Sequence, residues 1–122
     1  MEAKSIIDKI LNLPEKLYSP DNDQSMYSLL QNAGYFESHS DIDENSIKEA
    51  LEQQPQHVDQ WLQCSEDKRV DSGWFFTQNN DRKYLVGFLD ANKGITEKME
   101  YSDRKSACAV FIKRELESIR IS

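Results

Sequence analysis

The stretch WFFT at Trp74–Thr77 is followed by YLVGFL at Tyr84–Leu89 and by ITEKMEY at Ile95–Tyr101. These segments are rich in aromatic and β-branched residues, and polar turn residues separate them, which is typical of consecutive β-strands. Both alternating sets of positions in the middle segment are apolar, so we expect it to be the central strand. The last segment is expected to place Ile95, Met99 and Tyr101 on one face and Thr96, Lys98 and Glu100 on the other, as a solvated edge strand.

A helix is predicted after these strands, because the period of the apolar residues changes. Ser102 is expected to cap it, with Asp103 in its first turn. One side of the helix carries the apolar residues, which are Cys108, Phe111, Ile112, Leu116 and Ile119. The simplest assembly is a three-stranded antiparallel meander with this helix packed on one face.

The chain before Trp74 has helical periodicity. An apolar stripe from Ile6 to Leu11 is expected to stop at Pro14, and Met26–Ala33 is expected to end at Gly34. These segments predict short helices that complete the core.

Two further helices are predicted between residues 43 and 65. Asp43 can cap the first of them, and Ile42 and Ile47 stand at the two positions of a hydrophobic staple. Pro55 fits the first turn of the next helix, whose apolar stripe contains Trp61. We therefore predict one α+β domain over residues 1–122, with an acidic helical half at 1–67 and the meander plus C-terminal helix at 68–122.

Charge is distributed unevenly between these halves. Residues 1–67 hold fourteen Asp and Glu against four Lys and Arg, whereas residues 68–122 hold eight against eleven. The net charge of −7 argues against direct binding of nucleic acid, since phosphate contacts need clustered basic side chains. The same charge would attract a basic protein and speed its approach.

The chain carries few signals of a compartment or of a catalytic site. The apolar segment near the N-terminus contains Asp8 and Lys9, so we expect neither a signal peptide nor a membrane span. Cys64 and Cys108 are expected to be reduced thiols in a cytoplasmic protein. The only histidines, His39 and His57, are too far from other ligands to predict zinc. We expect no metal, no cofactor and no enzymatic activity.

Several stretches of the C-terminal half follow a familiar order. They are WLQCSEDKR at Trp61–Arg69, SGWFF at Ser72–Phe76, YLVG at Tyr84–Gly87 and ACAVFIKREL at Ala107–Leu116. In this order they resemble small immunity proteins of bacterial polymorphic-toxin and contact-dependent growth inhibition systems. Most of the matching positions are aromatic or aliphatic, and such positions report a fold better than a function.

The resemblance implies a cytoplasmic antidote that binds one cognate toxin domain tightly and blocks it. Many such toxins are nucleases with basic surfaces, which an acidic inhibitor would complement. We expect a monomer in a 1:1 complex, without membrane contact, and we place the specific contacts in the acidic half. The predicted contacts are Glu37, Asp41, Asp43, Glu44, Asp59, Glu66 and Asp67, with Tyr35 or Phe36 as an aromatic anchor.

Two other classes of binding protein fit the same composition. An acidic secretion chaperone would also be a small mixed α/β protein, but such chaperones usually act as dimers. A DNA-mimicking inhibitor would use its carboxylates in place of phosphates on a nuclease or a DNA-binding protein. These alternatives stay open at the level of the sequence.

Overall fold

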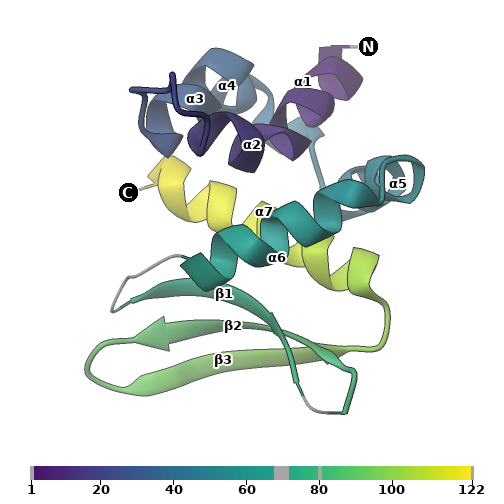
Figure 1. Cartoon of the computed structure of the whole chain (residues 1–122), viewed down its shortest axis with the longest axis vertical. Helices are drawn as coiled ribbons and strands as arrows, with labels where there is room; N and C mark the ends of the chain where they lie inside the picture. Colours follow the sequence, from purple (N-terminus) through teal and green to yellow (C-terminus); the bar gives the residue numbers. More distant parts are fainter. Residues whose placement is uncertain (1, 68–71, 80, 122) are drawn as a thin grey trace.

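The computed structural model describes residues 2–67, 72–79 and 81–121, with the side chains of Glu2, Ala3 and Asp67 left out. Helices form the first part of the described chain, the strands follow, and a long helix closes it (Figure 1). The elements are α1 (Glu2–Leu11), α2 (Leu13–Leu17), α3 (Met26–Ala33), α4 (Tyr35–Ser38), the 3-10 helix η1 (His39–Asp41), α5 (Glu44–Gln53), α6 (Gln56–Asp67), β1 (Gly73–Gln78), β2 (Tyr84–Asp90), β3 (Gly94–Tyr101) and α7 (Arg104–Ile121).

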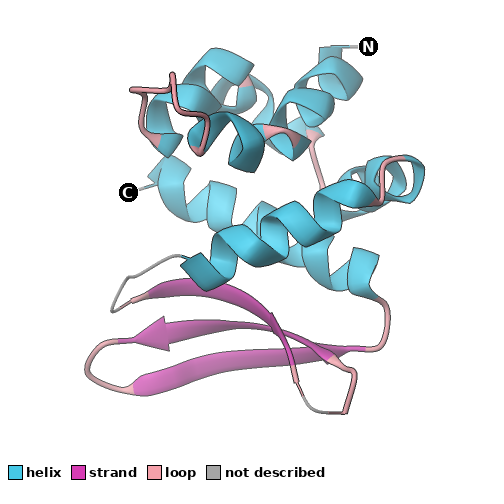
Figure 2. Ribbon diagram, viewed as in Figure 1, coloured by secondary structure: helices cyan, strands magenta, loops and turns pink. Residues whose placement is uncertain are grey.

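The three strands form one antiparallel sheet in the order β1-β2-β3. All the drawn helices lie on the same side of this sheet, with α6 and α7 next to it and α1 to α4 farther away (Figure 2). The predicted α+β class, the meander and the C-terminal helix on the sheet are therefore confirmed. The outer face of the sheet has no helix over it among the described elements.

Aromatic side chains fill the layer between the sheet and the helices. Phe76 of β1 and Trp61 of α6 both pack against Phe111 of α7, with ring centroids 5.7 and 6.1 Å apart, respectively. All three side chains are buried, and each contributes about 1.5–3 kcal/mol through the removal of apolar surface from water. This layer holds α6 and α7 in fixed positions on the sheet.

The third strand contains an irregularity that changes the predicted faces. Met99 pairs with Val86, but Ile95 pairs with Leu89, because the register shifts by one residue between these pairs. Val86 and Leu89 are three positions apart and lie on opposite faces, so Ile95 and Met99 do too. The prediction that they share a face is wrong, and Ile95 lies on the outer face with 57% of its surface exposed.

The helix ends agree with the sequence at two places. Gly34 ends α3 in the left-handed conformation, with φ of 91°. Asp43 caps α5 by accepting a hydrogen bond of 2.8 Å from the backbone N–H of Ser46, and the staple residues Ile42 and Ile47 are both buried. Both local predictions are confirmed.

Other helix ends differ from the prediction. The first helix stops at Leu11, and Pro14 lies inside the first turn of α2, where proline needs no N–H partner. Asp103 caps α7 in place of Ser102, since its carboxylate accepts from the backbone N–H of Ser106 over 3.2 Å. Helices α2, α4 and η1 were not anticipated.

Cys64 and Cys108 are both buried, and neither is part of a disulfide in the described part of the chain. Burial raises the pKa of the Cys108 thiol well above its ordinary value. None of the described helices is both long and apolar enough to cross a membrane.

Candidate partner-binding surface

A half-buried polar cluster fastens α4 and η1 to the C-terminal helix. The Tyr35 hydroxyl donates to Glu117 Oε2 over 2.5 Å and accepts from Lys113 Nζ over 2.9 Å. Lys113 also donates to the backbone carbonyl of His39 over 2.8 Å, and Arg120 donates twice to the Glu117 carboxylate at 2.9 Å. Such charge-assisted bonds hold the chain between residues 35 and 41 at a fixed place on α7.

The pKa values in this cluster follow from burial and hydrogen bonding. Burial is the largest cause that raises the pKa of Tyr35, and the hydrogen bond to Glu117 raises it further. The hydrogen bonds from Arg120 lower the pKa of Glu117 to about 2, with smaller contributions from Tyr35 and Lys113. Burial lowers the pKa of Lys113. The raised pKa of Tyr35 keeps its hydroxyl protonated, so that it remains the donor to Glu117.

Tyr35 is 0% exposed, so its ring has no surface to offer a partner. Its role as an aromatic anchor is therefore corrected, because the core and the Glu117 contact occupy both the ring and the hydroxyl. Phe36 is partly buried, and its ring centroid lies 5.0 Å from that of Tyr27. Tyr27 is 49% exposed, so Tyr27 and Phe36 together form an aromatic pair at the surface.

Two of the predicted carboxylates follow Phe36 closely in the chain. Glu37 follows Phe36 in α4, and Asp41 ends η1 four residues later. Both are exposed, and neither forms an ion pair with any described residue. We call Tyr27, Phe36, Glu37 and Asp41 the aromatic-acidic surface.

Three other predicted contact residues form ion pairs or hydrogen bonds within the protein. Glu44 lies 3.8 Å from Arg114 Nε, and Asp59 lies 3.4 Å from an Arg104 nitrogen, so α7 pairs with carboxylates of α5 and α6. Asp43 caps α5, and its hydrogen bonds with Ser46 lower its pKa. These pairs are partly exposed and worth little each, but they reduce the charge that these residues present to a partner.

The predicted set is therefore not one patch. Glu37, Asp41 and Asp43 lie within one short segment, whereas Asp59 and Glu66 lie seven residues apart on the same side of α6. Glu66 is exposed without a described ion pair, and the side chain of Asp67 lies outside the described part. Phe36, Glu37 and Asp41 thus belong to α4 and η1, whereas Asp59 and Glu66 belong to α6.

Sequence reasoning did not single out Tyr27 as a surface residue. Met26, Leu29, Leu30 and Ala33 already fill the i, i+3, i+4, i+7 pattern of α3, and three of these four are buried. Tyr27 lies to one side of that stripe, which is the signal that could have identified it. It reaches the surface beside Phe36, which comes from the next helix.

The described part of the chain has no group of three or more His, Cys, Asp or Glu side chains that could hold a metal ion. Comparisons of the chain with protein-family models, with curated proteins and with solved structures each found no match.

Proposed function

We propose that this chain is an immunity protein of a bacterial polymorphic-toxin or contact-dependent growth inhibition system. In this proposal it is a cytoplasmic monomer that binds a cognate toxin domain, a basic nuclease, in a 1:1 complex and neutralises it. It acts by binding and not by catalysis. The observation that carries the proposal is the aromatic-acidic surface, in which the half-exposed Tyr27 ring packs on Phe36, and the exposed Glu37 and Asp41, next along the chain, have no ion pair with a described residue.

The composition of this surface suits a protein partner. Aromatic anchors supply most of the energy at protein interfaces, and unpaired charges around them set the approach rate and the choice of partner. Hydrogen bonds of Tyr35 with Glu117 and Lys113 hold the start of α4 against α7. Little conformational entropy of this segment would therefore be lost on binding. A basic toxin would meet Glu37 and Asp41 without first breaking an internal ion pair.

Most of the residues that carry the resemblance to immunity proteins belong to the core of this chain. Trp61, Trp74, Phe76 and Phe111 are all buried in the layer between helices and sheet. Lys68 and Arg69 of the same motif lie outside the described residues. In this proposal the C-terminal half is the scaffold, and the helices before it carry the specific contacts.

The test is co-expression of the chain with the protein domain encoded immediately upstream of it, followed by pull-down and growth assays. We expect a stoichiometric complex and rescue from an otherwise lethal domain. The double variant E37K/D41K should weaken the complex about 100-fold and flatten its dependence on salt, because the attraction that salt screens is removed. The matched control is D81K/E97K, which changes the net charge equally at exposed positions near the sheet.

Each alternative class predicts a different outcome. A secretion chaperone would be a dimer by light scattering and would bind without protecting cells. A DNA-mimicking inhibitor would bind nucleases or DNA-binding proteins of unrelated sequence with similar affinity. Absence of a complex and of toxicity from the upstream domain would remove the main support for the immunity proposal.

A further inference from the structure

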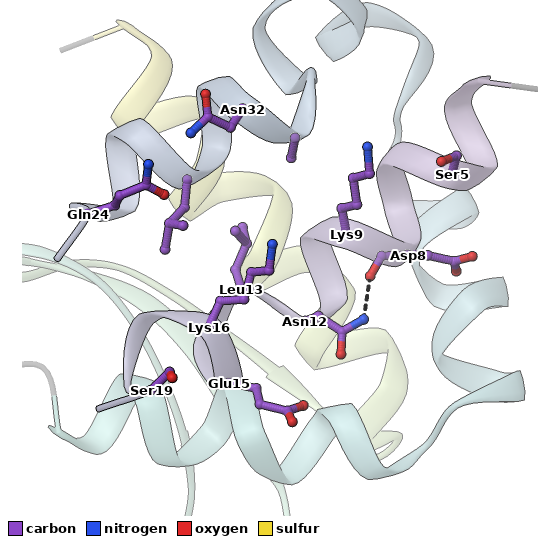
Figure 3. Close-up of a pocket in the computed structure, with 12 residues that line it drawn as sticks. Ser5, Asp8, Lys9, Asn12, Leu13, Glu15, Lys16, Ser19, Gln24 and Asn32 are labelled. Atoms are coloured by element: carbon purple, nitrogen blue, oxygen red, sulfur yellow. Dashed lines mark hydrogen bonds between the residues drawn. The ribbon is translucent and has the colours of Figure 1, made fainter. Parts of the chain in front are cut away.

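A groove of about 660 Å³ lies among α1, α2 and α3, away from the sheet (Figure 3). Its floor is apolar and consists of the buried side chains of Leu13, Leu29 and Ala33. Polar side chains from all three helices form its walls. This size is in the range of ligand sites and exceeds what a single inorganic anion fills.

Two lysines are the charged groups that the groove presents. In Figure 3 the side chains of Lys9 and Lys16 extend upward in the view, whereas the carboxylates of Asp8 and Glu15 extend to the right. The Asp8 carboxylate accepts a hydrogen bond of 3.1 Å from the side chain of Gln54, the residue that follows α5. The lining holds two lysines and two acidic residues, and the Asp8 carboxylate is already hydrogen-bonded to another part of the chain.

Neither lysine has an ion-pair partner among the described residues. This is unusual for its surroundings, since the first 67 residues hold fourteen acidic side chains and only four basic ones. By contrast, four of the five basic residues of α7 pair with carboxylates, namely Arg104, Lys113, Arg114 and Arg120. The ammonium groups of Lys9 and Lys16 are therefore available to an occupant of the groove.

Amide groups add neutral hydrogen-bonding capacity beside the lysines. The side chains of Gln24 and Asn32 line the groove, and neither amide is bonded to another described residue. Figure 3 places both of them across the groove from Lys16, on and just before α3. An occupant can therefore receive donors from both walls while an apolar part rests on Leu13 and Leu29.

We propose that this groove is a binding site for an acidic peptide segment of a protein partner. Carboxylates of the segment pair with Lys9 and Lys16, its amides meet Gln24 and Asn32, and a small apolar side chain covers the floor. The ammonium groups and the apolar floor together select for a segment that alternates acidic and apolar residues. This site is separate from the aromatic-acidic surface and has the opposite charge preference, so it stands whether or not the proposed function does.

The test follows the amide signals of the uniformly ¹⁵N-labelled full chain at about 0.15 M salt, where long-range repulsion by the net negative charge is screened. The probe is the acetylated and amidated hexapeptide Glu-Leu-Glu-Ala-Glu-Leu, in which acidic and apolar residues alternate. We expect saturable shifts confined to α1, α2 and the segment from Gln24 to Ala33. The same peptide with glutamine in place of glutamate should bind at least tenfold more weakly.

Paired variants localise the effect. K9Q/K16Q should weaken binding of the acidic peptide at least tenfold, while K93Q/K98Q, which changes the net charge equally on the sheet, should alter it less than twofold. Thermal melts of both variants establish that they are folded. Absence of shifts, equal binding of the glutamine peptide, or equal effects of the two variant pairs would overturn the proposal. So would inorganic phosphate at the same ionic strength, if it reproduced the full set of shifts.

Discussion

The side-chain hydroxyl of Ser65 accepts a hydrogen bond of 2.8 Å from the backbone N–H of Phe76. Ser65 belongs to α6 and Phe76 to β1, so a helix satisfies a backbone donor on the outer edge of an edge strand. Both residues are buried, and no water competes for this donor. The bond fixes how far α6 lies from the sheet and therefore where the α5–α6 pair sits.

The variant S65A is expected to lower the free energy of unfolding by about 1–3 kcal/mol, because it leaves the Phe76 N–H buried without an acceptor. Urea unfolding measures this change, and hydrogen exchange at the Phe76 amide should accelerate. S118A on α7, where the hydroxyl has no described partner, is the control and should stay within about 0.5 kcal/mol of wild type. A loss no larger than that of the control would contradict the proposed role of Ser65.

Acid should destabilise the protein through Glu117. Its pKa is about 2 in the folded chain and near 4.5 when unfolded, so its stabilising effect is fully present above pH 4.5 and is lost as the pH falls toward 2. The shift corresponds to at most about 3 kcal/mol, and we expect about 2 kcal/mol because the side chain is 30% exposed.

The variant E117Q should lose that stability at pH 7. Its free energy of unfolding should also fall less than that of wild type between pH 4.5 and 2, which we call the acid limb. Urea unfolding at a series of pH values measures both effects. E97Q, at an exposed position on β3, should retain the acid limb of wild type. Identical pH profiles for E117Q and wild type would rule out Glu117 as the source.

Gly87 in the central strand should not accept a side chain. A Cβ at this position would lie 2.4 Å from the backbone oxygen of Glu97 and 2.6 Å from the Phe75 ring, because that ring covers the glycine on the outer face. G87A is expected to cost about 1–3 kcal/mol through overpacking.

The matched control for this substitution is G94A, in the turn before β3. Gly94 has a φ of 78° and open space around its Cβ position, so alanine there adds about 1 kcal/mol of backbone strain and no clash. Thermal denaturation of both variants tests the ranking. Equal costs would mean that Phe75 or the β3 backbone moves aside.

Removal of the Tyr27 ring should affect partner binding and not folding. Y27A truncates a half-exposed side chain, so the free energy of unfolding should fall by less than about 1 kcal/mol. Affinity for the upstream-encoded domain should fall 10- to 30-fold, which is typical of an aromatic anchor.

I95A serves as the control for Y27A, since Ile95 is an exposed apolar residue on the outer face of the sheet. Calorimetric titration of each variant with the upstream-encoded domain should show an unchanged affinity for I95A. If both truncations weaken binding equally, the partner covers more than the aromatic-acidic surface.

Local patterns in the sequence were sufficient for most of the fold. The stop at Gly34, the cap at Asp43 and the three strands depend on neighbours within a few residues, and the structure has all of them. The extra residue in β3 is different, because the pairing of Ile95 with Leu89 depends on how two strands meet. The alternation inside a single strand contains no such information.

The candidate site could be predicted only in part, for a related reason. Glu37 and Asp41 are exposed as expected, but Glu44 and Asp59 face arginines that lie 70 and 45 positions farther along the chain. An excess of acidic residues in one segment does not show which of them a distant helix neutralises. The hydroxyl of the buried Tyr35 is hydrogen-bonded to Glu117, which is also a contact between residues far apart in the chain.

The two edges of the sheet differ in a way that limits how copies of this chain can join. Along β1, the bond from Phe76 to Ser65 and the adjacent α6 leave little room for an added strand, whereas β3 is exposed for most of its length. Fibrous growth by strand addition needs two open edges on each unit, one to join the copy before it and one to join the copy after it. With β3 as the single accessible edge of the described sheet, strand addition would stop at a pair of copies. The helices that cover the β1 edge would thus prevent growth of a cross-β fibre.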